Sequence, residues 1–204
     1  MSDQEEKRPV LRLASASPRR RQLLDLIGVP HVVTPADIDE TPHGAESPGH
    51  YVRRLAGDKA LAVRRLHRDL PVLAADTTVY IDGVILEKPR DEADCVRMLS
   101  LLSGQRHDVY TGLALVCEET PALVVAHSTV DFRKIERAEM LAYWASGEPQ
   151  GKAGAYAIQG FGAVFVEKVS GSYTGVMGLP LFETAELLRG HGIPVWNGGL
   201  KGGE

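Results

Sequence analysis

The chain is organised around residues 11–28, which read Leu11-Arg-Leu-Ala-Ser15-Ala-Ser17-Pro18-Arg19-Arg20-Arg21-Gln-Leu-Leu-Asp-Leu-Ile27-Gly28. This stretch predicts a short buried strand, a tight turn and a helix, because Ser17 suits the N-cap, Pro18 the first helical position and Gly28 the C-terminal stop. A strand that runs into a helix N-terminus gathers unpaired backbone N–H groups, here beside two hydroxyls and three arginines. The stretch therefore indicates an anion site suited to phosphate; an ordinary strand–helix turn with solvated arginines is the alternative that it leaves open.

The composition is that of a globular protein. The 204 residues are 44% hydrophobic and 25% charged, which suits one domain over residues 1–204 with mobile tails at 1–9 and 197–204. The formal net charge of -4 disfavours general binding of nucleic acid, so an anionic ligand needs a local basic pocket. Since no apolar run is long enough for a membrane span and residues 2–8 are charged where a signal peptide is apolar, we expect a cytoplasmic protein with no membrane partner.

Strands and helices alternate along the rest of the sequence, which predicts an α/β fold. Helices are expected at about 47–67, 91–102 and 138–145, with a last one ending at 188. Strands are expected at 31–34, 72–81, 84–86, 113–117, 122–132 and 163–169, and Asp82-Gly83 is a hairpin turn.

Carboxylates and lysines are spread along these elements. The acidic loop Asp37-Ile-Asp39-Glu40 could collect a divalent cation or be a solvated turn. Asp76 comes where an apolar strand run breaks, a place that favours either chemistry or the capping of a loop. The hairpin at Asp82-Gly83 directs Lys88 back along the strand that carries Asp76.

The sequence leaves two interpretations open for each of two further residues. Lys59 interrupts the apolar helix stripe of Tyr51, Leu55, Ala62 and Leu66, and it either extends to solvent or reaches across a cleft to a phosphate. His107 alternates with apolar strand residues, as a hydrogen-bonded edge histidine or a catalytic base would.

Short motifs in a fixed order cover roughly residues 11–190. They are Ser15-Ala-Ser17-Pro18-Arg19-Arg20, Asp39-Glu40, Asp58-Lys59-Ala60, Ala75-Asp76-Thr77, Glu87-Lys88-Pro89, His107-Asp-Val-Tyr-Thr111-Gly112, Lys152-Ala-Gly154-Ala-Tyr156 with Ile158-Gln159-Gly160, and Gly178-Leu-Pro180. Each motif alone is weak, but the ordered set resembles the Maf family of nucleoside triphosphate pyrophosphatases, first named for inhibition of septum formation.

The resemblance implies hydrolysis of a nucleoside triphosphate to the monophosphate and pyrophosphate with a divalent metal cation, Mg²⁺ or Mn²⁺. It also implies a mixed β-sheet flanked by helices, with two lobes around a deep cleft, like the Maf/Ham1 fold of inosine triphosphatases. The residues that it implies have distinct roles: Ser15, Arg19 and Arg20 hold the triphosphate, Lys59 and Lys88 come from the opposite wall, and Glu40 and Asp76 engage the metal and water, with Asp76 as proton acceptor. The roles of His107 and Thr111 stay open.

The resemblance also indicates the base. The branch that acts on dTTP and UTP carries Ile-Gln-Gly where this chain has Ile158-Gln159-Gly160, and a carboxamide suits the O4 acceptor and N3–H donor of uracil or thymine. Arg19 and Thr77 are the other positions that set specificity in the family. Gly151 is a departure, because many relatives have Asp before the lysine of the Lys-Ala-Gly motif.

Other functions remain compatible with the same motifs. The substrate could extend to CTP and modified pyrimidine nucleotides, the chain could be a 7-methyl-GTP-type pyrophosphatase, or it could be a nucleotide-binding regulator of septum formation with little turnover. The resemblance further implies a role in cleansing the nucleotide pool, and it suggests a homodimer.

Overall fold

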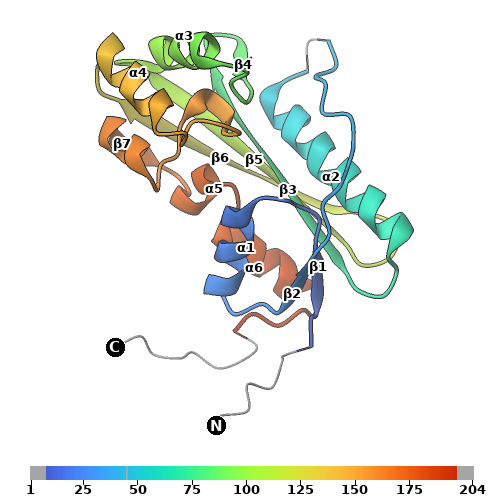
Figure 1. Ribbon diagram of the computed structural model, residues 1–204. Coiled ribbons are helices and arrows are strands. Elements are labelled where there is room, and N and C mark those ends of the chain that lie inside the picture. Colours follow the sequence, from blue (N-terminus) through green and yellow to red (C-terminus); the bar gives the residue numbers. More distant parts are fainter. Residues whose placement is uncertain (1–7, 45, 197–204) are drawn as a thin grey trace, which may run out of the picture.

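The computed structural model describes residues 8–44 and 46–196 (Figure 1). The strands are β1 (Leu11–Leu13), β2 (His31–Val33), β3 (Val72–Ile81), β4 (Val84–Leu86), β5 (Arg106–Val116), β6 (Ala122–Phe132) and β7 (Val166–Ser170). The α-helices are α1 (Pro18–Leu26), α2 (Pro48–Leu66), α3 (Glu92–Leu102), α4 (Arg137–Ala145), α5 (Tyr173–Met177) and α6 (Leu181–Gly190), and two 3₁₀ turns, η1 (Ala153–Ala155) and η2 (Phe161–Phe165), lie between α4 and β7.

The seven strands of the described residues form one mixed sheet, so the predicted α/β fold is confirmed. The strand order is β2-β1-β3-β5-β6-β7, and β4 pairs with β3. β1 pairs in parallel with both β2 and β3, whereas β3, β5, β6 and β7 follow one another antiparallel. β4 folds back on β3 through the predicted Asp82-Gly83 turn, in which both residues have positive φ as a two-residue hairpin requires.

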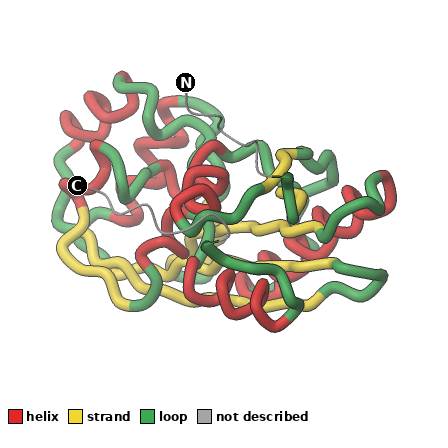
Figure 2. The backbone as a smooth tube through the Cα atoms, turned by 90° about the horizontal axis from the view of Figure 1, so that it is seen from below, coloured by secondary structure: helices red, strands yellow, loops and turns green. Residues whose placement is uncertain are grey.

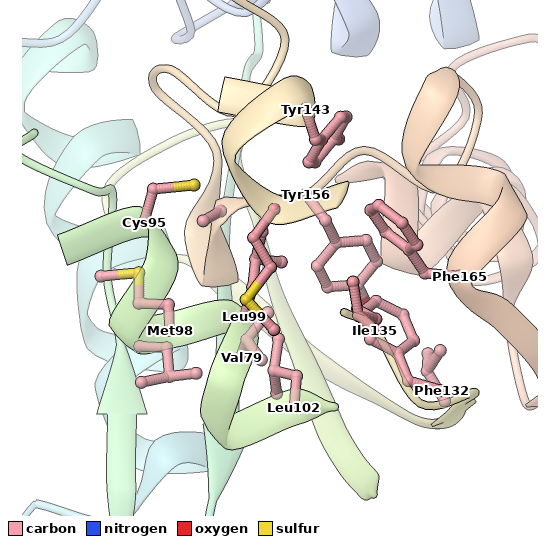
Figure 3. Packing of buried hydrophobic residues seen from close by; sticks show 14 of the residues in the cluster. Val79, Cys95, Met98, Leu99, Leu102, Phe132, Ile135, Tyr143, Tyr156 and Phe165 are labelled. Atoms are coloured by element: carbon pink, nitrogen blue, oxygen red, sulfur yellow. The ribbon is translucent and has the colours of Figure 1, made fainter. Parts of the chain in front are cut away.

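Helices cover both faces of the sheet (Figure 2). On one face α2 packs its small side chains, such as Ala56 and Ala60, against Ala74 of β3 and Ala114 of β5. The other face carries two separate hydrophobic clusters. The first joins α1 and α6 to the β1 end of the sheet, and the second joins α3 and α4 to the opposite end (Figures 1 and 3).

The two clusters meet β3 on either side of a short unpaired edge. The parallel pairing with β1 ends at Leu13↔Leu73, and the antiparallel pairing with β4 begins at Val79↔Leu86. Between these points the β1 side of β3 is open at Asp76 and Thr77, although β5 pairs with β3 without a break on the other side. A sheet opening of this kind beyond the carboxyl end of a parallel strand is a common place for a ligand in α/β proteins.

One local strand prediction is confirmed, and two local predictions need correction. The strand expected at 72–81 is confirmed, and β5 pairs with β3 through Asp76, so this residue lies inside the strand although the apolar run breaks there. Leu66 is 80% exposed in the last turn of α2, so the buried helix face ends at Val63. The strand expected at 163–169 begins only at Val166, because residues 161–165 form the η2 turn.

Other helix and strand boundaries agree with the prediction or differ from it by additional structure. The Ser17-Pro18 and Ser47-Pro48 helix starts are confirmed: each serine side chain accepts the backbone N–H of the residue three positions later. β5 begins at Arg106, earlier than expected, and α5 was not predicted. Of the tails predicted at residues 1–9 and 197–204, residues 1–7 and 197–204 lie outside the described residues. None of the described helices has the length and apolar composition needed to cross a membrane.

Candidate active site

A cavity of about 580 Å³ opens at the unpaired edge of β3. Residues from both clusters and from α2 line it, so it lies where the N-terminal strand–helix unit, the acidic loop and the Gly-rich segment meet. It brings together all nine of the site residues expected from the sequence, which are Ser15, Arg19, Arg20, Glu40, Lys59, Asp76, Thr77, Lys88 and Gln159.

Lys59 joins the two carboxylates of the cavity. Its Nζ donates to Asp76 Oδ1 at 2.7 Å and lies 2.6 Å from Glu40 Oε1. The side chains of Lys59 and Asp76 are only 10% and 11% exposed, so the charge pair is nearly desolvated. Of the two interpretations left open by the sequence, the structure favours the cleft, because Lys59 does not extend to solvent.

Glu40 is the acidic-loop residue that enters the cavity. Asp37 and Asp39 are exposed, and Asp39 accepts the backbone N–H of Thr41 instead. Burial raises the pKa of Glu40, but the hydrogen bonds and charges of Lys59 and Lys88 outweigh it and leave the pKa below its ordinary value. Glu40 is therefore a carboxylate at neutral pH.

The described residues contain no group of three or more His, Cys, Asp or Glu side chains arranged to hold a metal ion.

Tyr51 and Lys88 fix Glu40 from two sides. The Tyr51 hydroxyl lies 2.9 Å from the Glu40 carbonyl oxygen and 3.2 Å from Glu87 Oε1, and Lys88 Nζ donates to Glu40 Oε2 at 3.2 Å. The expected proximity of Lys88 to Asp76 is thus indirect and runs through Glu40 and Lys59. Burial and the carboxylate Asp76 raise the pKa of Tyr51, so its hydroxyl keeps its proton and remains a donor.

The N-terminus of α1 forms the opposite wall. Ser17 caps the helix, and Ser15 Oγ accepts from the Ser17 backbone N–H at 3.2 Å and from Arg20 Nη1 at 3.1 Å. Arg20 Nε donates to the Gly178 carbonyl oxygen at 2.8 Å, which joins α1 to the end of α5. This is the arrangement expected from residues 11–28: backbone donors at a helix start with a cation beside them.

A chain of hydrogen bonds holds Arg20 in place. Its Nη2 donates to Thr77 Oγ1 at 3.3 Å, Thr77 and Thr111 are 3.0 Å apart, and Thr111 Oγ1 donates to the Gly175 carbonyl oxygen at 2.8 Å. Because the Thr111 proton goes to a carbonyl, the Thr77 proton goes to Thr111, and Thr77 is left as acceptor for Arg20. Thr111 is thus part of the support of the site, which the sequence left undecided.

Among the described residues, the groups that accept hydrogen bonds from Arg20 are all neutral. Burial lowers the pKa of its guanidinium, and Asp76 and Glu40 act in the opposite direction through their charge. Guanidinium groups nevertheless stay protonated at neutral pH, so the positive charge is held ready for an anion.

Lys152 adds a cation that the sequence did not single out. It lies on the cavity wall near Arg19, and burial together with the Arg19 charge lowers its pKa. The pKa of Arg19 is lowered as well, mainly by burial and to a smaller extent by the charge of Arg20. The signal was present in the sequence, because Lys152 belongs to the Lys-Ala-Gly motif, but it carried no assigned role.

His107 does not belong to the cavity wall. It is 1% exposed, its Nε2 lies 2.9 Å from the Tyr156 hydroxyl, and its ring meets Phe132 and Tyr156 edge to face. Burial lowers its pKa to about 4. Of its two interpretations, the structure favours the structural one, since a buried neutral histidine outside the cavity has no path to a substrate.

Together, fold and site define an α/β protein with a cleft in which a helix N-terminus and arginines face two carboxylates bridged by a lysine. The sequence matches the family described as Maf-like protein over residues 10–191. The chain belongs to this Maf family.

Relatives with high identity carry one shared name. The dTTP/UTP pyrophosphatase of Saccharophagus degradans is 52% identical over 190 residues, which cover 91% of this chain and 90% of that protein. The dTTP/UTP pyrophosphatase of Bordetella parapertussis is 53% identical over 196 residues, with 92% and 95% covered. Among solved structures, the Staphylococcus aureus Ham1 protein is 16% identical, with a TM-score of 0.44 over 74% of this chain and 77% of that chain.

Proposed function

We propose that this chain hydrolyses dTTP and UTP to the nucleoside monophosphate and pyrophosphate. The observation that carries the proposal is the Lys59 bridge between Glu40 and Asp76, which faces the N-terminus of α1 and Arg20 across one cavity. The shared name of relatives about half identical to this chain supports the same reaction.

The triphosphate lies between the two walls in this proposal. The backbone N–H groups at the start of α1, with Ser15, Arg19 and Arg20, hold its oxygens on one side. Lys59 and Lys88 approach from the other side and offset the negative charge that builds on the departing pyrophosphate.

The reaction is an attack of water on the α-phosphorus. The water oxygen forms a bond to the α-phosphorus while the bond to the oxygen that bridges to the β-phosphate breaks, and pyrophosphate leaves. Asp76 accepts the proton of the attacking water, because its Oδ1 is fixed by Lys59 and its side chain faces the cavity. A positioned base contributes about 10²–10⁴-fold in rate.

A divalent cation suits the donor set. Mg²⁺ in phosphoryl-transfer sites is held by one or two carboxylates with phosphate oxygens completing the shell, and Mn²⁺ shares this preference for oxygen. Glu40 and Asp76 are two such carboxylates; Lys59 engages one oxygen of each, and Lys88 engages the second oxygen of Glu40. When bound there, the cation would neutralise phosphate charge and lower the pKa of a bound water.

Base selection in this proposal depends on Gln159. Its carboxamide lines the cavity, where it can pair with the O4 and N3–H of uracil or thymine. Thr77 contributes indirectly, because its hydroxyl is already engaged by Arg20 and Thr111. CTP and 7-methyl-GTP present different edges to the carboxamide and are the substrates to compare.

The test is pyrophosphate release from dTTP, UTP, CTP, GTP and 7-methyl-GTP, with Mg²⁺, Mn²⁺ or a chelator. Fast metal-dependent release from dTTP and UTP, with the monophosphate as co-product, is expected. Absence of release from every nucleotide, with nucleotide binding retained, would favour a regulator of septum formation with little turnover.

Two variants and one control variant sharpen the test. Asp76→Asn, which keeps the shape of the side chain, is expected to lower kcat on dTTP at least about 10²-fold while the protein stays folded. Asp82→Asn, at the exposed turn of the same hairpin, is the matched control and should retain activity. Gln159→Glu is expected to depress kcat/KM on UTP and dTTP more than on 7-methyl-GTP; equal losses on all three would mean that Gln159 does not read the base.

A further inference from the structure

The turn that carries Gln159 is held from outside the cavity by Tyr143 and Glu148. The Glu148 carboxylate accepts the backbone N–H of Phe161 at 2.9 Å (Oε2) and that of Gly162 at 3.0 Å (Oε1). Tyr143 donates its hydroxyl proton to Glu148 Oε1 at 2.6 Å and accepts the backbone N–H of Ala157 at 3.1 Å. The segment is therefore tied at Ala157 and again at Phe161 and Gly162, on both sides of Gln159.

Two glycines make room for this pair. A Cβ atom at Gly160 would lie 2.0 Å from Glu148 Oε2, and one at Gly162 would lie 2.6 Å from the Tyr143 hydroxyl. Only a residue without a side chain lets the backbone approach a carboxylate this closely. The Gly-rich character of residues 160–162 thus serves the contact with Glu148 and Tyr143 rather than looseness of the loop.

Tyr143 is itself rigidly placed. It is 5% exposed in the large hydrophobic cluster, and its ring meets Phe165 edge to face at 5.1 Å between centroids (Figure 3). Burial and the hydrogen bond to Glu148 raise the pKa of the Tyr143 hydroxyl, so it keeps its proton. Burial raises the pKa of Glu148, but the bonds from Tyr143, Gly162 and Phe161 outweigh it, and the carboxylate stays ionised.

Glu148 does not line the cavity, whereas Gln159 does. We propose that Glu148, with Tyr143, is a positioning residue that fixes the Gln159 turn and so sets selectivity for the base. The inference rests on the proposed function in so far as Gln159 contacts the nucleobase. Glu148 has a second influence, because its charge also acts on Arg19 and Lys152, and the experiment has to separate the two.

The variant is Glu148→Gln, with Glu167→Gln on the exposed face of β7 as matched control. Kinetics on dTTP are compared with competitive inhibition by inorganic triphosphate, which has no base. We expect KM for dTTP to rise about tenfold in Glu148→Gln with a smaller change in kcat, since a hydrogen bond to a charged group is lost. The inhibition constant of inorganic triphosphate should stay within about twofold of wild type.

A Gln159→Ala variant shows whether Glu148 acts through Gln159. In Gln159→Ala, the added Glu148→Gln substitution should change KM for dTTP less than about twofold, because coupled residues are not additive. Tyr143→Phe should shift KM in the same direction as Glu148→Gln, by a smaller factor. An equal loss for dTTP and inorganic triphosphate, or an undiminished effect in Gln159→Ala, would overturn the inference in favour of a general electrostatic role.

Amide hydrogen exchange tests the positioning role of Glu148 without any measurement of activity. The amides of Phe161 and Gly162 should exchange at least about tenfold faster in Glu148→Gln than in wild type and in Glu167→Gln. Absence of pyrophosphate release by the wild type would refute the proposed function and leave this measurement intact. Unchanged exchange would refute the positioning role whatever the activity.

Discussion

Replacement of Lys59 by methionine is the most informative single perturbation of the cavity. Methionine keeps much of the length and apolar surface of the lysine stem but removes the charge that Glu40 and Asp76 share at 2.6 and 2.7 Å. Two carboxylates then face one another without the cation between them. We expect the variant to lose both stability and activity, and the two losses have separable causes.

The stability cost follows from burial. Removal of one partner from a buried ion pair costs about 3–5 kcal/mol, because the other charge stays desolvated. The Glu40 side chain is 39% exposed and can be rehydrated, whereas that of Asp76 is 11% exposed and cannot. The lower end of the range applies, so Lys59→Met should lower the free energy of unfolding by about 3 kcal/mol, or roughly a hundredfold in the equilibrium constant.

Urea unfolding of a small set of variants measures this cost. Lys59→Met/Asp76→Asn removes the stranded charge and should recover about 1–2 kcal/mol relative to Lys59→Met, without any recovery of pyrophosphate release. Lys168→Met, at an exposed position of β7, is the control and should stay within about 0.5 kcal/mol of wild type. A double variant no more stable than Lys59→Met would refute the assignment of the cost to Asp76.

Two more predictions concern stability. Gly112→Ala should destabilise the protein by more than about 2 kcal/mol in thermal unfolding, because the new Cβ would lie 2.3 Å from the Val52 carbonyl oxygen of α2. Gly190→Ala is the control, since a Cβ there would meet no neighbouring group within 4 Å. Equal stability of the two variants would contradict the argument. The pKa of His107 is lowered from 6.5 to about 4 by burial, so the unfolded chain binds more protons between these values and stability is lost as the pH falls through this window. The expected loss between pH 8 and pH 5 is about 2 kcal/mol, and a His107→Asn variant with the same pH slope would contradict it.

The sequence predicted best those parts of the fold that depend on neighbouring residues alone. The Ser-Pro helix starts at Ser17 and Ser47 and the hairpin at Asp82-Gly83 are local, because a side chain or a positive φ completes them within four residues. The extension of β5 back to Arg106 could not be predicted in this way, since its partners on β6 lie between 13 residues (Gly112↔Val125) and 25 residues (Arg106↔Asp131) away. The η2 turn likewise depends on contacts with Glu148, which lies 13 and 14 residues before the two backbone N–H groups that it accepts.

The candidate site likewise combines features that neighbouring residues determine with features that only the fold determines. All nine residues named through the resemblance line one cavity, and the sequence also predicted the strand at 72–81 that carries Asp76. The functional environment of Asp76 comes from the neighbouring strands, because β1 stops at Leu13 and β4 begins at Val84. Glu148 was missed altogether: in the sequence it is one acidic residue in a Gly-Glu-Pro turn, and only the fold brings it beside Gly160.

The distribution of charge accounts for anion binding by a chain of net charge -4. Five cationic side chains line the cavity against two carboxylates, and those carboxylates are already paired with Lys59 and Lys88. Within the described residues, Arg19, Arg20 and Lys152 form no ion pair, so their charge is available to a ligand. Arg19 and Arg20 belong to α1, and the charge of Arg19 acts on Lys152, so the unpaired positive charge of the cavity lies on the α1 side. In the proposed reaction, these cations hold the triphosphate and its α-phosphorus faces Asp76, which is the orientation that attack by water requires.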